Sequence, residues 1–121
     1  TTFVPPPLGQ VVLVEPANGM TDAEVEDLPF VWNSVADATY YTFQITDDET
    51  FTNILFSQDF EVTSLLVTGF DYLTTYYWRV MAKNDLGNSG PWSEIWSFTT
   101  QGELFPQDLM VAFQLKARGI F

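Results

Sequence analysis

Residues 70–82 read FDYLTTYYWRVMA, and this stretch of the 121-residue chain decides the fold. A loop leads through two threonines into a segment of strict alternation, in which Tyr76, Trp78, Val80 and Ala82 fall on one face. The opposite face carries Tyr77, Arg79, Met81 and Lys83. The alternation predicts a strand with one buried and one exposed face. Tyr76 stands at its entrance, with a hydroxyl group that can reach back to the preceding turn.

A tyrosine at the entrance of such a strand is typical of a tyrosine corner, which fixes one strand of a Greek-key sandwich to the corner before it. Short apolar segments separated by turn residues recur over residues 10–100, as an all-β sandwich requires. We expect seven strands, at residues 11–14, 30–32, 38–46, 54–56, 65–68, 76–82 and 94–100. Residues 21–27 are expected to form an acidic loop. The core-facing residues that define the fold are Trp32, Tyr41, Phe70, Tyr76 and Trp78.

Length and composition favour a single globular domain. Apolar residues make up 46% of the chain and aromatic residues 17%, which is far from the composition of disordered chains. No apolar run approaches the roughly 20 residues that a membrane span requires, so membrane insertion is not expected. The chain begins at Thr1 without a secretory signal, and we expect it to be an excised or processed piece of a longer protein.

The charge of the chain narrows the range of partners. Sixteen acidic residues against four basic ones give a net charge of −12, which repels nucleic acid and anionic lipid alike. Histidine and cysteine are absent, which excludes the usual catalytic triads, thiol chemistry, and zinc sites built on imidazole or thiolate. The expected partners are neighbouring domains of the same chain, another protein or a glycan.

The sequence divides into three parts. Residues 1–9 contain three consecutive prolines and are expected to be a lead-in or linker. Residues 10–100 form the expected sandwich. Residues 101–121 are a neutral tail, in which Asp108 can cap a helix and Gly119 can end it. One face of this helix would carry Leu109, Phe113 and Ala117. The tail is an appended helix, the start of a following segment or a remnant of an expression vector.

Several motifs occur in the order in which a known family has them. They are Trp32, the pattern Tyr41-x-Phe43-x-Ile45, Phe70 six residues before Tyr76, and the closing stretch PWSEIWSFTT at residues 91–100. Together they resemble a fibronectin type III domain over about residues 10–100. The bacterial branch is the closest likeness, because of residues 33–41 and 75–80.

The resemblance implies a seven-stranded immunoglobulin-like sandwich that is not an enzyme. In secreted bacterial proteins such domains look like spacers and interaction modules, or like parts of surface adhesins, so an extracellular or cell-surface location is implied. The family usually has a leucine where Phe70 stands and often a proline where Tyr72 stands, so the packing of that corner is expected to differ. Residues 84–90 contain no Arg-Gly-Asp, and integrin recognition of the familiar kind is not implied.

Clustered carboxylates leave two other functions open. Asp47, Asp48 and Glu49 offer oxygens of the kind that calcium takes from loops, but they lack the spacing of a dedicated calcium loop. We therefore expect an acidic turn and no cofactor. An enzyme with two catalytic carboxylates is a further alternative, since acids are plentiful. The acids lie in expected loops without a cleft to change their pKa values, so a non-catalytic role is favoured.

The exposed face of the two central strands is the candidate surface for a ligand or partner. It carries Tyr40, Thr42, Gln44, Tyr77, Arg79 and Met81, with Ile95 beside them. Such a face could stack a sugar ring or receive a neighbouring domain, so a weak carbohydrate-binding module is the alternative to a spacer or interaction module. Cross-strand pairing is the simpler explanation. Tyr40 and Tyr77 would then lean on each other and on the stem of Arg79, with no ring face free for a sugar.

Overall fold

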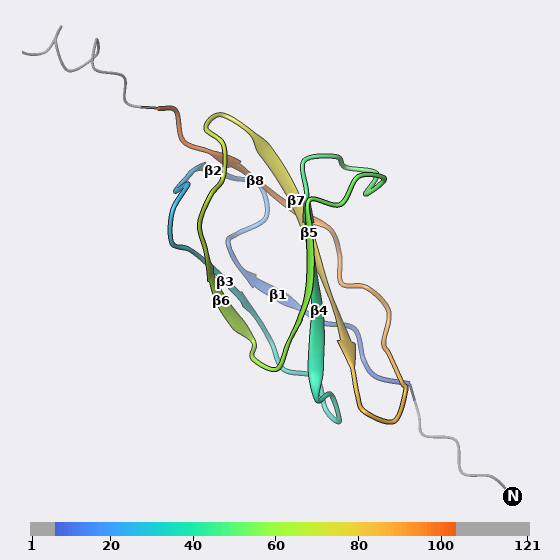
Figure 1. Cartoon of the computed structure of the whole chain (residues 1–121). Coiled ribbons are helices and arrows are strands. Elements are labelled where there is room, and N and C mark those ends of the chain that lie inside the picture. The colour runs from blue at the N-terminus through green and yellow to red at the C-terminus, as the bar shows by residue number, and fades with distance from the viewer. Residues whose placement is uncertain (1–6, 104–121) are drawn as a thin grey trace, which may run out of the picture.

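The computed structural model describes residues 7–103, which form two β-sheets packed face to face (Figure 1). The three-stranded sheet has the order β1 (Leu13–Glu15), β3 (Leu28–Trp32) and β6 (Ser64–Val67). The five-stranded sheet has the order β2 (Met20–Ala23), β8 (Trp96–Thr100), β7 (Thr75–Lys83), β4 (Tyr40–Thr46) and β5 (Phe56–Phe60). The predicted all-β sandwich is confirmed. Residues 1–6 of the expected lead-in and the expected helix of the tail lie outside the described residues.

The strand with strict alternation is the central strand β7. It pairs antiparallel with β4 on one side and with β8 on the other. Tyr76, Trp78, Val80 and Ala82 are buried, and the residues between them are half-buried. The predicted orientation of this strand is confirmed, because a period of two places alternate side chains in the core.

The core is an aromatic cluster that joins the two sheets. Phe30 of β3 is fully buried, and its ring centre lies 5.3 Å from that of Phe43, 4.9 Å from Trp78 and 5.7 Å from Phe98. All three pairs are edge-to-face, the arrangement that the charge distribution of aromatic rings favours. Trp32 stacks on Phe43 from the same sheet as Phe30. Each ring of the cluster therefore contacts a partner across the sandwich.

The described residues form eight strands where seven were expected, and two elements differ most from their prediction. Residues 21–27 were expected to be a loop, but β2 occupies their first part and pairs parallel with β8. Of the four residues of β2 only Ala23 is buried, so the sequence has no apolar alternation there. The strand expected at residues 54–56 in fact begins at Phe56 and runs through three polar residues to Phe60. Its place at the edge explains this composition, since among the described residues β5 pairs with β4 alone.

The tyrosine corner is present, and the same device occurs twice. The backbone N–H of Asp71 donates a hydrogen bond of 2.9 Å to the Tyr76 hydroxyl oxygen, and the N–H of Val35 donates one of 3.0 Å to that of Tyr41. Burial raises the pKa of the Tyr76 phenol. Phe70 packs on the Tyr76 ring at 4.9 Å between ring centres, in the position where the family usually has a leucine. Each tyrosine thus ties a central strand to the loop before it.

Replacing Tyr76 by phenylalanine tests the corner. Tyr76→Phe keeps the ring that packs on Phe70 but removes the acceptor of the Asp71 N–H, so it should lower the free energy of unfolding by about 1 kcal/mol without changing the fold. Urea denaturation measures the change. Tyr72→Phe, at an exposed position, is the control and should leave the midpoint unchanged. An unchanged midpoint in Tyr76→Phe as well would mean that the corner bond does not stabilise the domain.

Candidate functional site

The candidate face lies on the outer side of β4 and β7. The register pairs Tyr40 with Lys83, Thr42 with Met81, Gln44 with Arg79, and Thr46 with Tyr77. Tyr40 and Tyr77 are therefore six positions apart along β4, or about 20 Å. The expectation that the two tyrosines lean on each other is wrong, since no pair of tyrosine rings can touch over this distance. Tyr40, Gln44 and Tyr77 do not form a single platform.

Arg79 is the centre of this face. Its guanidinium carbon lies 4.3 Å from the centre of the Phe51 ring and 4.1 Å from that of the Trp92 ring. Nε and Nη2 donate hydrogen bonds of 3.0 and 2.9 Å to Oε1 of Gln44. Burial lowers the pKa of Arg79 from its very high ordinary value, and the group remains charged. The guanidinium is held by two aromatic rings and one amide, which stiffens the outer face.

Phe51 and Trp92, whose rings hold Arg79, were not among the predicted site residues. Phe51 lies in the loop between β4 and β5 with a φ angle of 55°, in the left-handed region that bulky side chains rarely adopt. Trp92 follows Gly90 and Pro91, in a stretch without strand alternation. An Asp-x-Thr-x-Thr pattern at residues 48–52 was the available signal for a structured loop, because such side chains bond to the nearby backbone.

Asp48 organises this loop. Its carboxylate accepts hydrogen bonds from the N–H groups of Thr50 and Thr52 at 3.1 and 3.0 Å, and from the hydroxyl groups of both threonines. The N–H of Phe51 donates to the Asp48 carbonyl oxygen at 2.9 Å. The bonds from Thr52 and Thr50 hold the pKa of the Asp48 carboxyl well below its usual range. Both carboxylate oxygens thus have protein donors, and the loop places Phe51 over Arg79.

The described residues do not bring carboxylates together for a metal. Within residues 7–103 no group of three or more histidine, cysteine, aspartate or glutamate side chains could hold a metal ion. Asp47 and Glu49, the neighbours of Asp48, are exposed.

Among residues 7–103, no helix is long and apolar enough to cross a membrane.

A groove of about 460 Å³ lies between β5 and β6, and we call it the edge groove. Its lining is mainly apolar and includes Leu55, Phe56, Phe60, Leu65, Leu66 and Phe70. Asp71 is the one carboxylate in the lining, so the groove lacks the paired acids of a glycosidase. A second hollow beside β1 and β2 is bordered by Glu15, Asp22 and Glu24, all of them exposed.

The strand order defines an immunoglobulin-like sandwich, and comparison with solved structures specifies it further. The chain is similar to the 6th fibronectin type III domain from human fibronectin type III domain containing protein 3, with 21% identity, a TM-score of 0.59, and coverage of 88% of this chain and 94% of that one. A solved fibronectin type-III domain of human fibronectin type III domain containing protein 3 is 19% identical, with a TM-score of 0.61, and the match covers 88% of this chain and 97% of that one. The fibronectin(III)-like modules of Clostridium thermocellum CbhA are 11% identical, with a TM-score of 0.55, and the match covers 78% of this chain and 99% of that one.

These likenesses show the fold, which is that of a fibronectin type III domain. No protein-family model matches the sequence, and no curated protein matches it.

Replacing Arg79 by lysine tests the stack, by which we mean the Arg79 guanidinium with the rings of Phe51 and Trp92. Lysine keeps the charge but has no planar group to fit between two rings and cannot bond twice to Gln44, so Arg79→Lys should lower the free energy of unfolding by about 1–2 kcal/mol. Urea denaturation measures it. Lys83→Arg, on the same face of β7, is the control and should change stability by less than about 0.5 kcal/mol. Equal effects of the two variants would contradict a structural role for the stack.

The low pKa of Asp48 makes the stability of the loop depend on pH. Its hydrogen bonds favour the charged form in the folded state, so its contribution is present above the ordinary aspartate pKa of about 3.9 and is lost as the pH falls further. Wild type should therefore unfold at higher urea than Asp48→Asn at pH 7, and this difference should shrink below about pH 4. Asp47→Asn removes the same charge from an exposed neighbour and serves as the control. A difference that does not vary with pH would refute this role of the charge.

Proposed function

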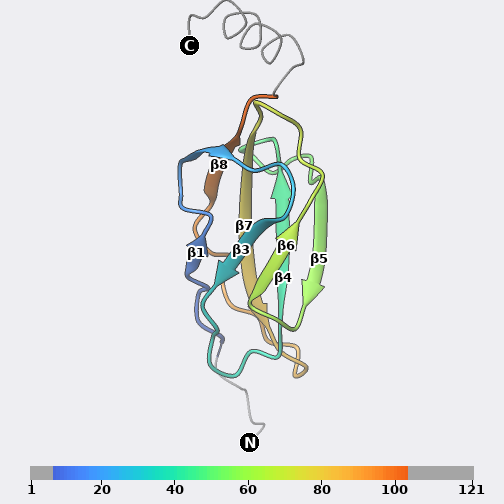
Figure 2. The ribbon, with the colours of Figure 1, turned by 90° about the vertical axis from the view of Figure 1, so that its left-hand side faces the viewer.

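We propose that the chain is a non-catalytic module of a larger extracellular bacterial protein and acts as a spacer between the segments that flank it. One observation carries the proposal: the described chain enters the sandwich at one end and leaves it at the other (Figures 1 and 2). A module of this form separates its neighbours by its own length. Its partners are then neighbouring domains of the same chain, or another protein that contacts it.

Local contacts fix the entry point of the chain. Leu8 is buried in the core, two residues before the expected boundary of the sandwich. The backbone of Leu8 and Gly9 lies against Gly90, where an added Cβ would fall 2.4 Å from the Gly9 carbonyl oxygen. Nε2 of Gln10 donates a hydrogen bond of 2.9 Å to the Trp92 carbonyl oxygen. The chain therefore enters beside the turn between β7 and β8.

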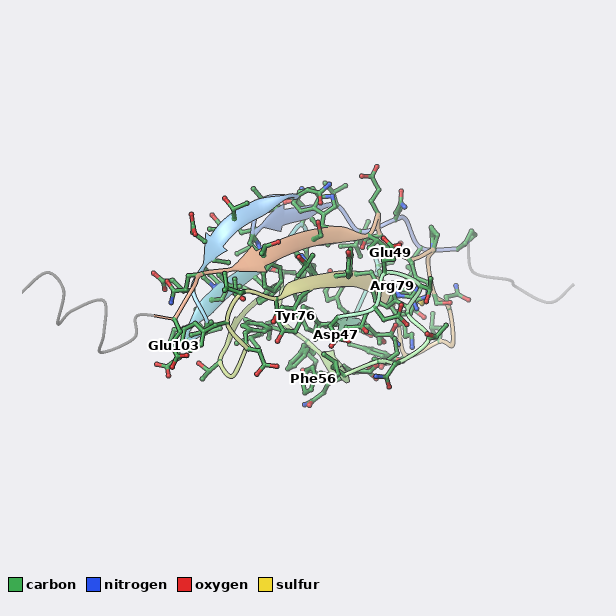
Figure 3. All side chains as sticks on the ribbon, turned by 90° about the horizontal axis from the view of Figure 1, so that it is seen from above. Asp47, Glu49, Phe56, Tyr76, Arg79 and Glu103 are labelled. Carbon is green, nitrogen blue, oxygen red and sulfur yellow. The ribbon has the colours of Figure 1, made fainter. Side chains whose placement is uncertain are left out.

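Backbone hydrogen bonds fix the exit point. The N–H of Gln101 donates to the Ala23 carbonyl oxygen at 2.9 Å, and the N–H of Leu73 donates to the Gln101 carbonyl oxygen at 3.0 Å. Leu73 precedes β7, whereas Gly90 follows it, and the nine residues of β7 span about 26 Å. Figure 3 shows Glu103 at the opposite end of the sandwich from Arg79. Entry and exit are thus separated by the length of the central strand.

The comparisons support a modular role. The human relative is the 6th domain of its kind in its protein, and the CbhA structures are of modules in a bacterial protein. The chemistry of the chain supports the absence of catalysis, since it has no histidine or cysteine and Asp48 is occupied by its own loop. The separation of Tyr40 and Tyr77 gives no support to a carbohydrate-binding face at these residues.

Distances between two spin labels, measured by electron paramagnetic resonance on the full chain, test the spacer proposal. The chain has no cysteine, so spin labels attach only at Pro7→Cys and Glu103→Cys, two exposed positions. We expect one narrow distance maximum at or above about 26 Å, because both ends are tied to the sandwich by the contacts above. The control pair, Pro7→Cys with Ser89→Cys, labels a single end and should give a clearly shorter distance. A broad distribution, or equal distances for the two pairs, would overturn the spacer proposal.

A further inference from the structure

Among residues 7–103, the sandwich has an apolar side at the edge groove that no other element covers. The groove is lined by residues of β5, the edge strand of the five-stranded sheet, and of β6, an edge strand of the three-stranded sheet, which lie at the same margin of the sandwich (Figure 2). Within residues 7–103, β5 pairs only with β4 and β6 only with β3. Leu66 is 70% exposed, Leu55 52% and Phe56 41%, and all three line the groove. Unpaired strand edges beside a patch of this kind are suited to receive another segment of protein.

Charge limits what this segment can be. Asp71 lines the groove and Glu61 is exposed just after β5, whereas Asp59 of β5 accepts a hydrogen bond from Thr42 on the outer face of the sheet. Of the sixteen acids and four bases of the chain, one acid and two bases fall in residues 104–121, so residues 1–103 hold fifteen acids and two bases, a net charge of −13. An occupant that combines apolar side chains with basic ones fits this surface, and an acidic one is repelled.

The chain contains such a segment directly after the described residues. Residues 104–121 read LFPQDLMVAFQLKARGIF, with mostly apolar side chains and the bases Lys116 and Arg118. Gly102, near the end of the described chain, lies against the Leu73 side chain, and Leu73 is two residues from Asp71 of the lining. Eighteen residues reach about 27 Å even as a helix, which is as long as the central strand. The segment can therefore reach the groove of its own domain.

We propose that residues 104–121 dock into the edge groove of their own domain. The expected helix would lay Leu109 and Phe113 on the apolar lining, with Lys116 and Arg118 attracted by Asp71 and by the net negative charge of the domain. This is the way in which amphipathic helices bind hydrophobic grooves, and covalent linkage supplies a high effective concentration. The inference goes beyond the spacer role, since docking would set the direction in which the chain leaves the domain.

Amide hydrogen exchange on the full chain tests the docking. We expect the amides of residues 109–118 to exchange at least about tenfold more slowly than in a free peptide of residues 104–121. Leu66→Glu places a carboxylate on the lining and should return these amides to the rate of the free peptide. Leu86→Glu is the matched control: Leu86 is 72% exposed, lies in the turn after β7, and should leave the protection unchanged.

A variant in the tail provides a second, independent test of the docking. Phe113→Gln leaves the groove intact and should also abolish the protection, which keeps the test valid if Leu66→Glu fails to fold. Rapid exchange in the wild-type tail, or protection that persists in folded Leu66→Glu, would overturn the proposal. Protection that disappears on dilution would overturn it too, because the occupant would then come from a second copy. Spin labels at residues 7 and 103 do not report on the tail, so this proposal and the spacer proposal can fail separately.

Discussion

The burial of Phe30 is the interaction on which the rest of the structure depends. The chain has no cysteine, so no disulfide joins the two sheets. Phe30 comes from the three-stranded sheet and meets Phe43, Trp78 and Phe98 of the five-stranded sheet edge-on. A buried aromatic side chain removes a large apolar area from water, and edge-to-face contacts add to this. The registers of β4, β7 and β8 must therefore be correct together, because each supplies one of these rings.

The outer face follows a different rule, since a charged group organises it. Phe51 adopts a left-handed backbone conformation, which costs on the order of 1–2 kcal/mol for a residue of this kind. The hydrogen bonds of Asp48 and the contact of Phe51 with Arg79 offset this cost. The rings of Phe51 and Trp92 are used to hold Arg79, so this face serves rigidity. A rigid face on a domain whose ends are tied to the sandwich is consistent with a spacer.

The sequence predicts those parts of the fold in which local pattern and burial coincide. Alternation in residues 76–82 predicts β7 because both neighbours of that strand force every second side chain into the core. The hydroxyl of Tyr76 could be assigned for the same reason, since the corner lies within a few residues of the strand. By contrast, β2 is held by parallel pairing with residues almost eighty positions away, and its own residues have no alternation.

The outer face was the least predictable part. The candidate residues of β4 and β7 do lie on one side of the sheet, but alternation does not say which positions stand opposite each other. Tyr40 and Tyr77 were therefore predicted to lie together, although the register separates them. The pattern did not indicate the role of Phe51 and Trp92 either, because loops bring them to Arg79 and no strand period reports on loops.

The edge groove follows from the unequal widths of the two sheets. Three strands cannot cover the inner face of five, so the margin of the wider sheet extends past the narrower one. Phe56 and Phe60 stand opposite Ile45 and Tyr41 and so face the core side, yet Phe56 remains 41% exposed. On the other margin, the exposed residues of β2 are Met20, Thr21 and Asp22. An apolar margin gains free energy when a further segment covers it. A segment with basic and apolar residues follows residue 103 in the chain, and Gly102 lies against Leu73, two residues after Asp71 of the lining.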